Sequence, residues 1–308
     1  MNFPQIKGIN YYFKSVSVDH LKELQNDFDV GNFNGNLSDN ETYRYYLSYK
    51  KFAIPKALPD SKSLIILAIS TRLMRVKFHL EGEIFDVIVP PPYYDDGLTF
   101  EEIENLIKNE IIKESGYEIE ETRDHLFLKI LAVRSGLAKY GRNNICYIKG
   151  MGSFFSLFAY YTNFKMPSDG WCNLELMELC QNCNYCLRSC PTNAIRESNF
   201  IIDAGRCISL YNEIDGEIPK WVNPNSHHAL MGCIQCQSHC PGNNEKLKNV
   251  GYFEDISNKE TKMLLDGDFN SELIKSLSVK IKMFDMSNGE KYLPRLSRNL
   301  NLIIKQRK

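Results

Sequence analysis

Eight of the ten cysteines in this 308-residue chain fall into two short runs. The first run is Cys180-x-x-Cys183-x-x-Cys186-x-x-x-Cys190-Pro191, and the second is Cys207 followed by Cys233-x-x-Cys236-x-x-x-Cys240-Pro241. Three thiolates from one tight loop and a fourth from elsewhere make the ligand set of a [4Fe–4S] cluster. The spacing therefore predicts two such clusters and eight metal ligands.

The cysteine that precedes each proline is predicted to bind the cluster of the other run, because two-cluster ferredoxins are wired in this way. Cluster A would then take Cys180, Cys183, Cys186 and Cys240. Cluster B would take Cys207, Cys233, Cys236 and Cys190. The chemistry that follows from such a pair is electron transfer.

Zinc and disulfide bonds are the alternatives for these thiols. Zinc usually takes two separated Cys-x-x-Cys pairs, whereas three cysteines here fall within seven residues. Disulfide frameworks are typical of short secreted chains, and the first residues of this long chain do not read as a secretory leader. Cys146 and Cys172 stand outside the runs, and we expect both to be small buried apolar side chains.

The composition is that of a globular protein, with 43% apolar and 24% charged residues. A net charge of −1 gives no overall field toward nucleic acid or an anionic membrane. No apolar run approaches the roughly 20 residues that span a bilayer, so no membrane contact is expected. We expect a cytoplasmic location, where reducing conditions also protect exposed clusters.

Changes in composition and in residue pattern along the chain predict three parts. Residues 1–170 mix helices and strands, residues 171–250 hold the clusters, and residues 251–308 read as helices with a basic tail. From Lys291 to Lys308 there are six basic residues and no acidic ones. Such a strip fits either a solvated, poorly ordered terminus or a binding surface.

Local patterns place strands at 63–70, 145–148 and 154–161, and a hairpin of 75–80 with 84–89 that turns at Gly82. Thr99-x-x-Glu102 is a capping box for a helix that runs to Gly116, and a second helix is expected from Asp124. The last 65 residues are expected to be helical, at 246–250 and at 271–282 among others. Helices interleave with hairpins rather than strict βαβ units, which indicates the α+β class.

Four stretches share a pattern with one group of enzymes. They are residues 132–143 (Ala-Val-Arg-Ser-Gly-Leu-Ala-Lys-Tyr-Gly-Arg-Asn), residues 152–155 with the strand end at 161–163, the second cysteine run with Asn243, and Arg298-Asn299-Leu300. On these residues the chain resembles epoxyqueuosine reductases and, more distantly, reductive dehalogenases. The resemblance spans about 130 to 300 of the chain and is most specific in the cluster half.

The resemblance implies a nitroreductase-like cobalamin-binding domain followed by a ferredoxin-like domain with two [4Fe–4S] clusters. It places cofactor contacts at Gly136, Leu137, Tyr140, Gly141, Arg142, Asn143 and Ser153. The two glycines of the loop would let the backbone approach a flat corrin, and the arginine and amides could bind its polar fringe. The alternative is a plain loop in which Gly136 ends a helix and Asn143-Asn144 form a turn.

The chain departs from the family at the proton donor. An ungapped alignment places Thr122 where the family has an aspartate, and Asp124 lies two residues away. Asp124 is the candidate general acid, or it caps the following helix. Tyr93, Tyr94, Tyr140 and His125 are other possible donors.

These features predict a cytoplasmic iron–sulfur oxidoreductase, a cobalamin-dependent reductase that passes electrons from two clusters to cobalt. Its donor would be a low-potential protein of ferredoxin or flavodoxin type, and its substrate small or protein-borne. A tRNA substrate is doubtful, because the helical-repeat domain of many epoxyqueuosine reductases does not follow the clusters here. The alternative is an electron-transfer or corrinoid-activating protein whose front domain binds a partner or flavin.

Overall fold

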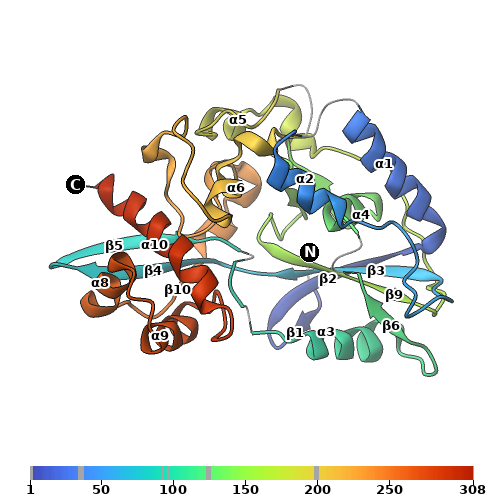
Figure 1. The fold of residues 1–308 in the computed structure, drawn as a ribbon. Helices are drawn as coiled ribbons and strands as arrows, with labels where there is room; N and C mark the ends of the chain where they lie inside the picture. Colours follow the sequence, from blue (N-terminus) through green and yellow to red (C-terminus); the bar gives the residue numbers. More distant parts are fainter. Residues whose placement is uncertain are drawn as a thin grey trace.

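A five-stranded antiparallel sheet forms the centre of the amino-terminal part of the protein (Figure 1). The computed structural model describes residues 3–33, 38–91, 93–95, 97–122, 126–197 and 201–307. In sheet order the strands are β1 (Gln5–Ile6), β2 (Ile9–Ser17), β3 (Ser63–Ser70), β9 (Phe155–Thr162) and β6 (Ile119–Glu121). The α+β class predicted from the sequence is confirmed.

Strand β3 is apolar along its whole length because both faces of the sheet are covered. Leu64, Ile66 and Ala68 face a core shared with α1 (Leu21–Phe33) and α4 (Leu128–Arg134). The alternate side chains, Ile65, Leu67 and Ile69, face α3 (Phe100–Leu106) and the π-helical turn Ile107–Ile112 on the other side. Figure 1 shows these helices above and below the sheet. Because successive side chains of a strand point to opposite faces of the sheet, β3 contributes to two separate hydrophobic cores.

A second, three-stranded sheet has the order β10-β4-β5. Its strands are β4 (Leu73–Leu80), β5 (Glu83–Val89) and β10 (Val250–Tyr252), and β10 runs parallel to β4. The predicted hairpin is confirmed, with Glu81 and Gly82 in its turn at φ 53° and 89°. The expected helix at 246–250 is wrong: a short 3₁₀ turn, Lys246–Lys248, leads directly into β10.

The carboxyl-terminal helices pack against this hairpin rather than against each other alone. They are α8 (Asn258–Asp266), α9 (Ser271–Ile281) and α10 (Gly289–Lys305), and α9 matches the helix predicted at 271–282. One core joins Val76, Phe85 and Val87 of the hairpin to Leu277 and Leu300 of the helices. The boundaries at 170 and 250 stay a prediction, but this core crosses the second of them.

The basic tail is not a loose terminus. Helix α10 is strongly amphipathic and buries an apolar stripe that includes Leu293, Leu296 and Leu300. Arg298 donates to the carbonyl oxygens of Ile214 at 3.0 Å and Tyr211 at 2.7 Å. The sequence suggested solvated charges because a count of basic residues does not show their helical period, which places apolar residues between them.

The cluster segment lies above the junction of the two sheets in Figure 1 and is made of short elements. Its helices are α5 (Tyr185–Ser189), α6 (Ile208–Glu213) and α7 (Gln235–Ser238). Other 3₁₀ turns of the described chain are Val18–His20, Glu178–Asn182, Ala204–Arg206, Pro224–Ser226 and Pro241–Asn243. Helix α2 (Glu41–Ser48) lies beside α6. The backbone of Leu230 donates to Ile88 O at 2.8 Å, which fixes this segment to the hairpin.

Other local predictions hold in part. The capping box of Thr99 and Glu102 is present, but the helix ends at Lys113 in the left-handed region, before Gly116. The strand predicted at 145–148 is shorter, since β8 spans Cys146–Tyr147, and it pairs with β7 (Lys139–Tyr140). Helix α4 begins at Leu128, and Asp124 and His125 lie outside the described residues. Among the described helices, none is long and apolar enough to cross a bilayer.

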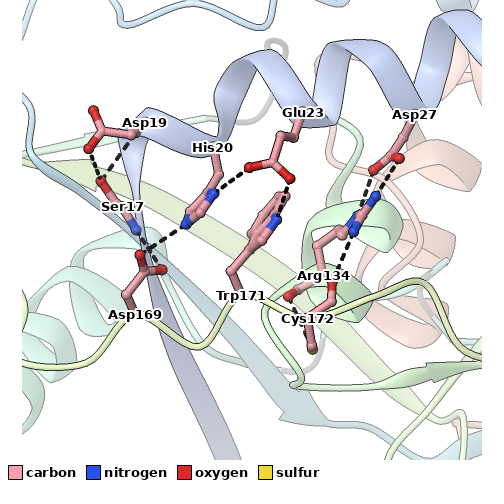
Figure 2. A network of polar contacts seen from close by, with 9 residues as sticks. All are labelled: Ser17, Asp19, His20, Glu23, Asp27, Arg134, Asp169, Trp171 and Cys172. Atoms are coloured by element: carbon pink, nitrogen blue, oxygen red, sulfur yellow. Dashed lines mark hydrogen bonds and ion pairs between the residues drawn. The ribbon is translucent and has the colours of Figure 1, made fainter.

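A polar network fixes the segment before the clusters to the front domain (Figure 2). Arg134 of α4 donates to both carboxylate oxygens of Asp27 at 2.7 and 2.6 Å and to Cys172 O at 3.1 Å. The His20 ring stacks on Trp171 with centroids 4.2 Å apart. Because Trp171 and Cys172 lie just ahead of Cys180 in the chain, the network fixes the position at which the cluster segment begins.

Stability conferred by His20 is expected to depend on pH. Burial alone would lower its pKa, but the hydrogen bonds with Glu23 and Asp169, each 2.9 Å long, raise the pKa above the ordinary 6.5. The stabilisation is therefore full below about pH 6.5 and is lost as pH rises through the folded-state pKa. In urea titrations, His20→Gln should cost about 1 kcal/mol at pH 5.5 and less at pH 8.5. Equal losses at both pH values would contradict this account.

Candidate functional site

The eight cysteines of the two runs form two groups of four in space. Burial raises the pKa of Cys186 to about 11, and the nearby thiols that raise it further are Cys180, Cys240 and Cys183. Burial raises the pKa of Cys233 to about 12, with smaller contributions from Cys207 and Cys190. This is the grouping that the crossed wiring needs. The assignment of each ligand stays a prediction.

Clustered buried thiols are difficult to ionise without a compensating cation. Burial raises the pKa of Cys236 well above that of a free thiol, and Cys233, Cys207 and Cys190 add to the effect. Iron supplies the compensating charge. In the described ranges no three His, Cys, Asp or Glu side chains could hold one metal ion together; a cubane does not require this, since each of its cysteines binds a different iron.

A cavity of about 830 Å³ lies between the front domain and the cluster segment. The cluster side of its wall includes Cys190, Cys207, Cys233 and Cys236, which are the four predicted ligands of cluster B. The opposite side includes Ile145, Cys146, Phe155, Ser156, Leu157 and Phe158 from the β8–β9 region. None of the predicted cluster A ligands, all of which are described, is among the lining residues. On the predicted ligand assignment, the cavity therefore adjoins cluster B.

Two of the predicted cofactor contacts, Asn143 and Ser153, line this cavity. The Asn143 amide donates to Tyr147 Oη at 2.9 Å and to Cys236 O at 3.5 Å. Ser153 Oγ donates to Gln237 Oε1 at 2.8 Å. Both side chains thus connect the front domain to the loop that carries cluster B.

The other predicted contacts lie elsewhere. Leu137 and Tyr140 are buried in the core beneath α4. Gly136 ends α4 at φ 70°, so the alternative interpretation of a helix-terminating glycine describes its conformation. Gly141 faces the protein's own side chains, because a Cβ there would lie 2.5 Å from Asn143 Oδ1. A cofactor role for these four residues stays a prediction without support from their position.

Arg142 reaches the cluster A side of the molecule. Its guanidinium donates to Cys180 O at 2.7 Å and also to Glu197 O. The side chain is therefore hydrogen-bonded to the backbone around the first cysteine run. Its predicted contact with a cofactor is likewise not supported by its position.

Gly152 allows the front domain and the second cysteine run to meet closely. It has φ 66°, and a Cβ there would lie 2.5 Å from Asn243 Oδ1. The same oxygen accepts from Ser153 N at 2.8 Å, and the Asn243 amide donates to Ser153 Oγ at 2.8 Å and Gln237 O at 3.0 Å. This buried network explains why Gly-Ser and the distant Asn243 occur together.

Sequence reasoning missed Lys129, which lines the cavity from the first turn of α4. Its ammonium donates to Asn144 O at 3.0 Å and Asn144 Oδ1 at 2.7 Å. The residue is exposed, yet burial lowers the pKa of its ammonium. The exposure of the side chain and the lowered pKa are compatible if its exposed surface faces a deep cavity. No sequence signal marked this residue, because a helix expected from Asp124 would have placed Lys129 in its second turn, as an ordinary helical lysine.

The donors Tyr93 and Tyr94 also line the cavity. Tyr93 Oη donates to Glu213, and burial raises the pKa of both groups. Tyr94 Oη donates to Arg72 O at 2.6 Å. Cys146 is buried as predicted, whereas Cys172 is exposed, contrary to the prediction. Cys172 lies beside the carbonyl of Arg134 at a chain crossing where water still has access.

Residues 179–243 match the protein family described as a 4Fe-4S double cluster binding domain. These residues contain all eight clustered cysteines, which confirms the two [4Fe–4S] clusters. The chain is thus a mixed α/β protein that carries a double-cluster domain beside a cavity.

Among curated proteins, the chain is similar to epoxyqueuosine reductases. It is 35% identical over 152 residues to that of Aliivibrio fischeri, covering 46% of this chain and 39% of that protein. It is 36% identical over 114 residues to that of Escherichia coli, covering 37% and 29%. The chain therefore matches less than half the length of these relatives. The resemblance recognised from the sequence is confirmed.

Solved epoxyqueuosine reductases share the fold. The Streptococcus thermophilus enzyme aligns with 96% of this chain and 80% of its own, at 19% identity and a TM-score of 0.61. An epoxyqueuosine reductase solved with an epoxyqueuosine-modified tRNA stem loop aligns with 95% of this chain and 76% of its own, at 20% identity and a TM-score of 0.64. At these identities the likeness establishes the architecture.

The comparisons contradict the expectation that tRNA is a doubtful partner. The relatives are epoxyqueuosine reductases, and one solved structure with this fold contains a tRNA stem loop. The expectation relied on net charge and on a missing repeat domain. Net charge was a poor guide, because an RNA contact needs only a local surface.

Proposed function

We propose that this protein is a cobalamin-dependent iron–sulfur reductase that acts on epoxyqueuosine in tRNA. The observation that carries the proposal is the cavity of about 830 Å³ with the cluster B cysteines in its wall. A protein that only relays electrons needs no such space against a cluster. The similarity to epoxyqueuosine reductases supports the substrate.

The cavity wall suits a flat, largely apolar cofactor with a polar fringe. Phe155, Leu157 and Phe158 of the β9 side offer apolar surface, and Asn143, Ser153, Ser156 and Gln237 offer hydrogen-bonding groups. When bound there, cobalamin would supply a cobalt that accepts electrons. The predicted ligands of cluster B line this wall, and those of cluster A do not. Electrons would then enter at cluster A from a low-potential donor and leave through cluster B.

The overall chemistry is the loss of the epoxide oxygen. Both C–O bonds of the epoxide break and a carbon–carbon double bond forms. The balance requires two electrons, supplied through the clusters by a low-potential protein donor, and two protons, with water as the second product. A reducing cytoplasm stays the predicted location, because it offers both the donor and protection of the clusters.

We expect anaerobic protein supplied with cobalamin, a low-potential reductant and an epoxyqueuosine-containing tRNA stem loop to complete many turnovers. Nucleoside digestion and mass spectrometry would detect queuosine. Cys236→Ala should abolish the reaction, because it removes a predicted ligand of the cluster at the cavity wall. Cobalamin binding without any conversion of the RNA would refute the substrate and keep the cofactor. Absence of cobalamin binding would refute the proposal as a whole.

A further inference from the structure

Lys129 carries the only ammonium group among the described residues that line the cavity. The single lining carboxylate in those ranges, Asp95, is exposed and accepts from Gly97 N at 2.8 Å. The cavity is otherwise apolar or neutral apart from the cysteines. A ligand group that carries or develops negative charge therefore meets one cation there.

The local structure shows that Lys129 is held in place at some energetic cost. It occupies the first turn of α4, where a positive charge opposes the helix dipole. Asn144 accepts two hydrogen bonds from the ammonium, through its backbone and its side chain. Asn144 adopts φ 60°, a left-handed conformation that asparagine tolerates better than most residues, in a turn closed by the hydrogen bond from its own N–H to Gly141 O at 3.0 Å.

The surroundings of the ammonium make its hydrogen bonds strong. Apart from Asp95 and the cysteines, the rest of the described cavity wall around Lys129 is apolar or neutral. A partly desolvated cation interacts with a polar ligand atom more strongly than a solvated one does. The two acceptors on Asn144 use two of the three N–H groups of the ammonium. One N–H group has no acceptor among the described residues and can be offered to a ligand.

The two tyrosine hydroxyls that line the cavity already donate to other groups. Tyr93 donates its hydroxyl hydrogen to Glu213, and Tyr94 donates its own to Arg72 O. Thr122, which aligns with the family's acid, is fully buried and does not line the cavity. Asp124 lies outside the described residues. Within the described part of the cavity wall, Lys129 is thus the one cationic donor that could meet a reacting oxygen.

We propose that Lys129 is a catalytic residue that donates a hydrogen bond to the epoxide oxygen as its C–O bonds break. This inference rests on the proposed function. The oxygen gains negative charge as the electrons arrive, and a preorganised cation lowers the energy of that state more than that of the bound substrate. The oxygen leaves as water after taking two protons, in the balance given above.

Variants of Lys129 separate this role from a structural one. Lys129→Met should lower kcat about 100-fold, the typical effect of losing one donor to a developing oxyanion. Its iron content and its affinity for the stem loop should stay within about twofold, because the role is confined to the transition state. Lys129→Arg, which keeps a charged donor, should recover at least part of the loss. Lys149→Met, at an exposed lysine outside the cavity, is the matched control.

A second measurement uses the unaltered protein and does not depend on activity. Trace acylation of amines, read by peptide mass spectrometry, reports the reactivity of each lysine in anaerobic, cobalamin-loaded protein. Adding the epoxyqueuosine-containing stem loop should slow the reaction of Lys129 at least tenfold. Lys246, which is partly buried and does not line the cavity, is the internal comparator.

Each outcome is decisive for one of the two proposals or for both. If Lys129→Met turns over within twofold of wild type, or if bound stem loop leaves Lys129 as reactive as before, the role of Lys129 is wrong and the proposed function stands. If wild-type protein never converts the RNA, the proposed function fails and the inference fails with it.

Discussion

Replacing Cys190 by Ser is expected to remove cluster B, although Cys190 lies in the first cysteine run. Its thiol contributes to the raised pKa of Cys233 and Cys236, which both line the cavity. Iron should fall from about eight atoms per chain to about four. Because cluster B adjoins the cavity, reduction of any substrate there should stop completely. Anaerobic iron analysis and electron paramagnetic resonance would measure the result.

Cys183→Ser is the matched control for this experiment. It also removes one thiol from the first run, but it should remove cluster A and leave the signal of cluster B. The crossed wiring is wrong if Cys190→Ser and Cys183→Ser lose the same cluster. The family match would remain unaffected by that result, since it does not depend on which cysteine binds which iron.

Cobalamin is expected to bind with a Kd below about 10 μM, equivalent to some 7 kcal/mol. Ser156→Trp should weaken this binding at least a hundredfold, because the indole would occupy the cavity from strand β9. Val279→Trp, at a position 63% exposed on α9, should have no effect. Calorimetry on anaerobic protein with full iron content would measure both variants.

Retention of tight cobalamin binding in Ser156→Trp would place the cofactor elsewhere. Tight binding of flavin instead would favour the alternative derived from the sequence, a front domain built for a different cofactor. Iron analysis on the same samples separates loss of the cavity from loss of the fold.

The clusters were predictable because the local spacing of the cysteines is characteristic of cluster binding. Cysteines with two or three residues between them are close in any compact loop, so the cluster-binding motif is recognisable without knowledge of the fold. The hairpin at Gly82 and the capping box at Thr99 are local for the same reason, and both are confirmed. Strand β3 was recognisable from its apolar run alone.

The cavity could not be predicted, because its walls come from segments that are distant in sequence. Lys129 and Cys236 are more than 100 residues apart and meet only when the front domain packs on the cluster segment. Arg142 and Asn143 are neighbours in the chain, yet one contacts the cluster A loop and the other lines the cavity. The order of residues in the sequence does not show that two neighbours in one loop contact different parts of the protein.

The contacts of α10 bear on when the clusters can be installed during biosynthesis. Arg298 binds the carbonyls of Tyr211 and Ile214, and the buried amide of Asn299 donates to Asn212 O at 2.9 Å and Leu230 O at 3.0 Å. The segments that carry Cys207 and Cys233 therefore reach their final positions only after the ribosome has made residues roughly 65 to 90 positions downstream. A nascent chain would expose its thiols throughout this interval, so we expect iron–sulfur delivery to follow the synthesis of α10.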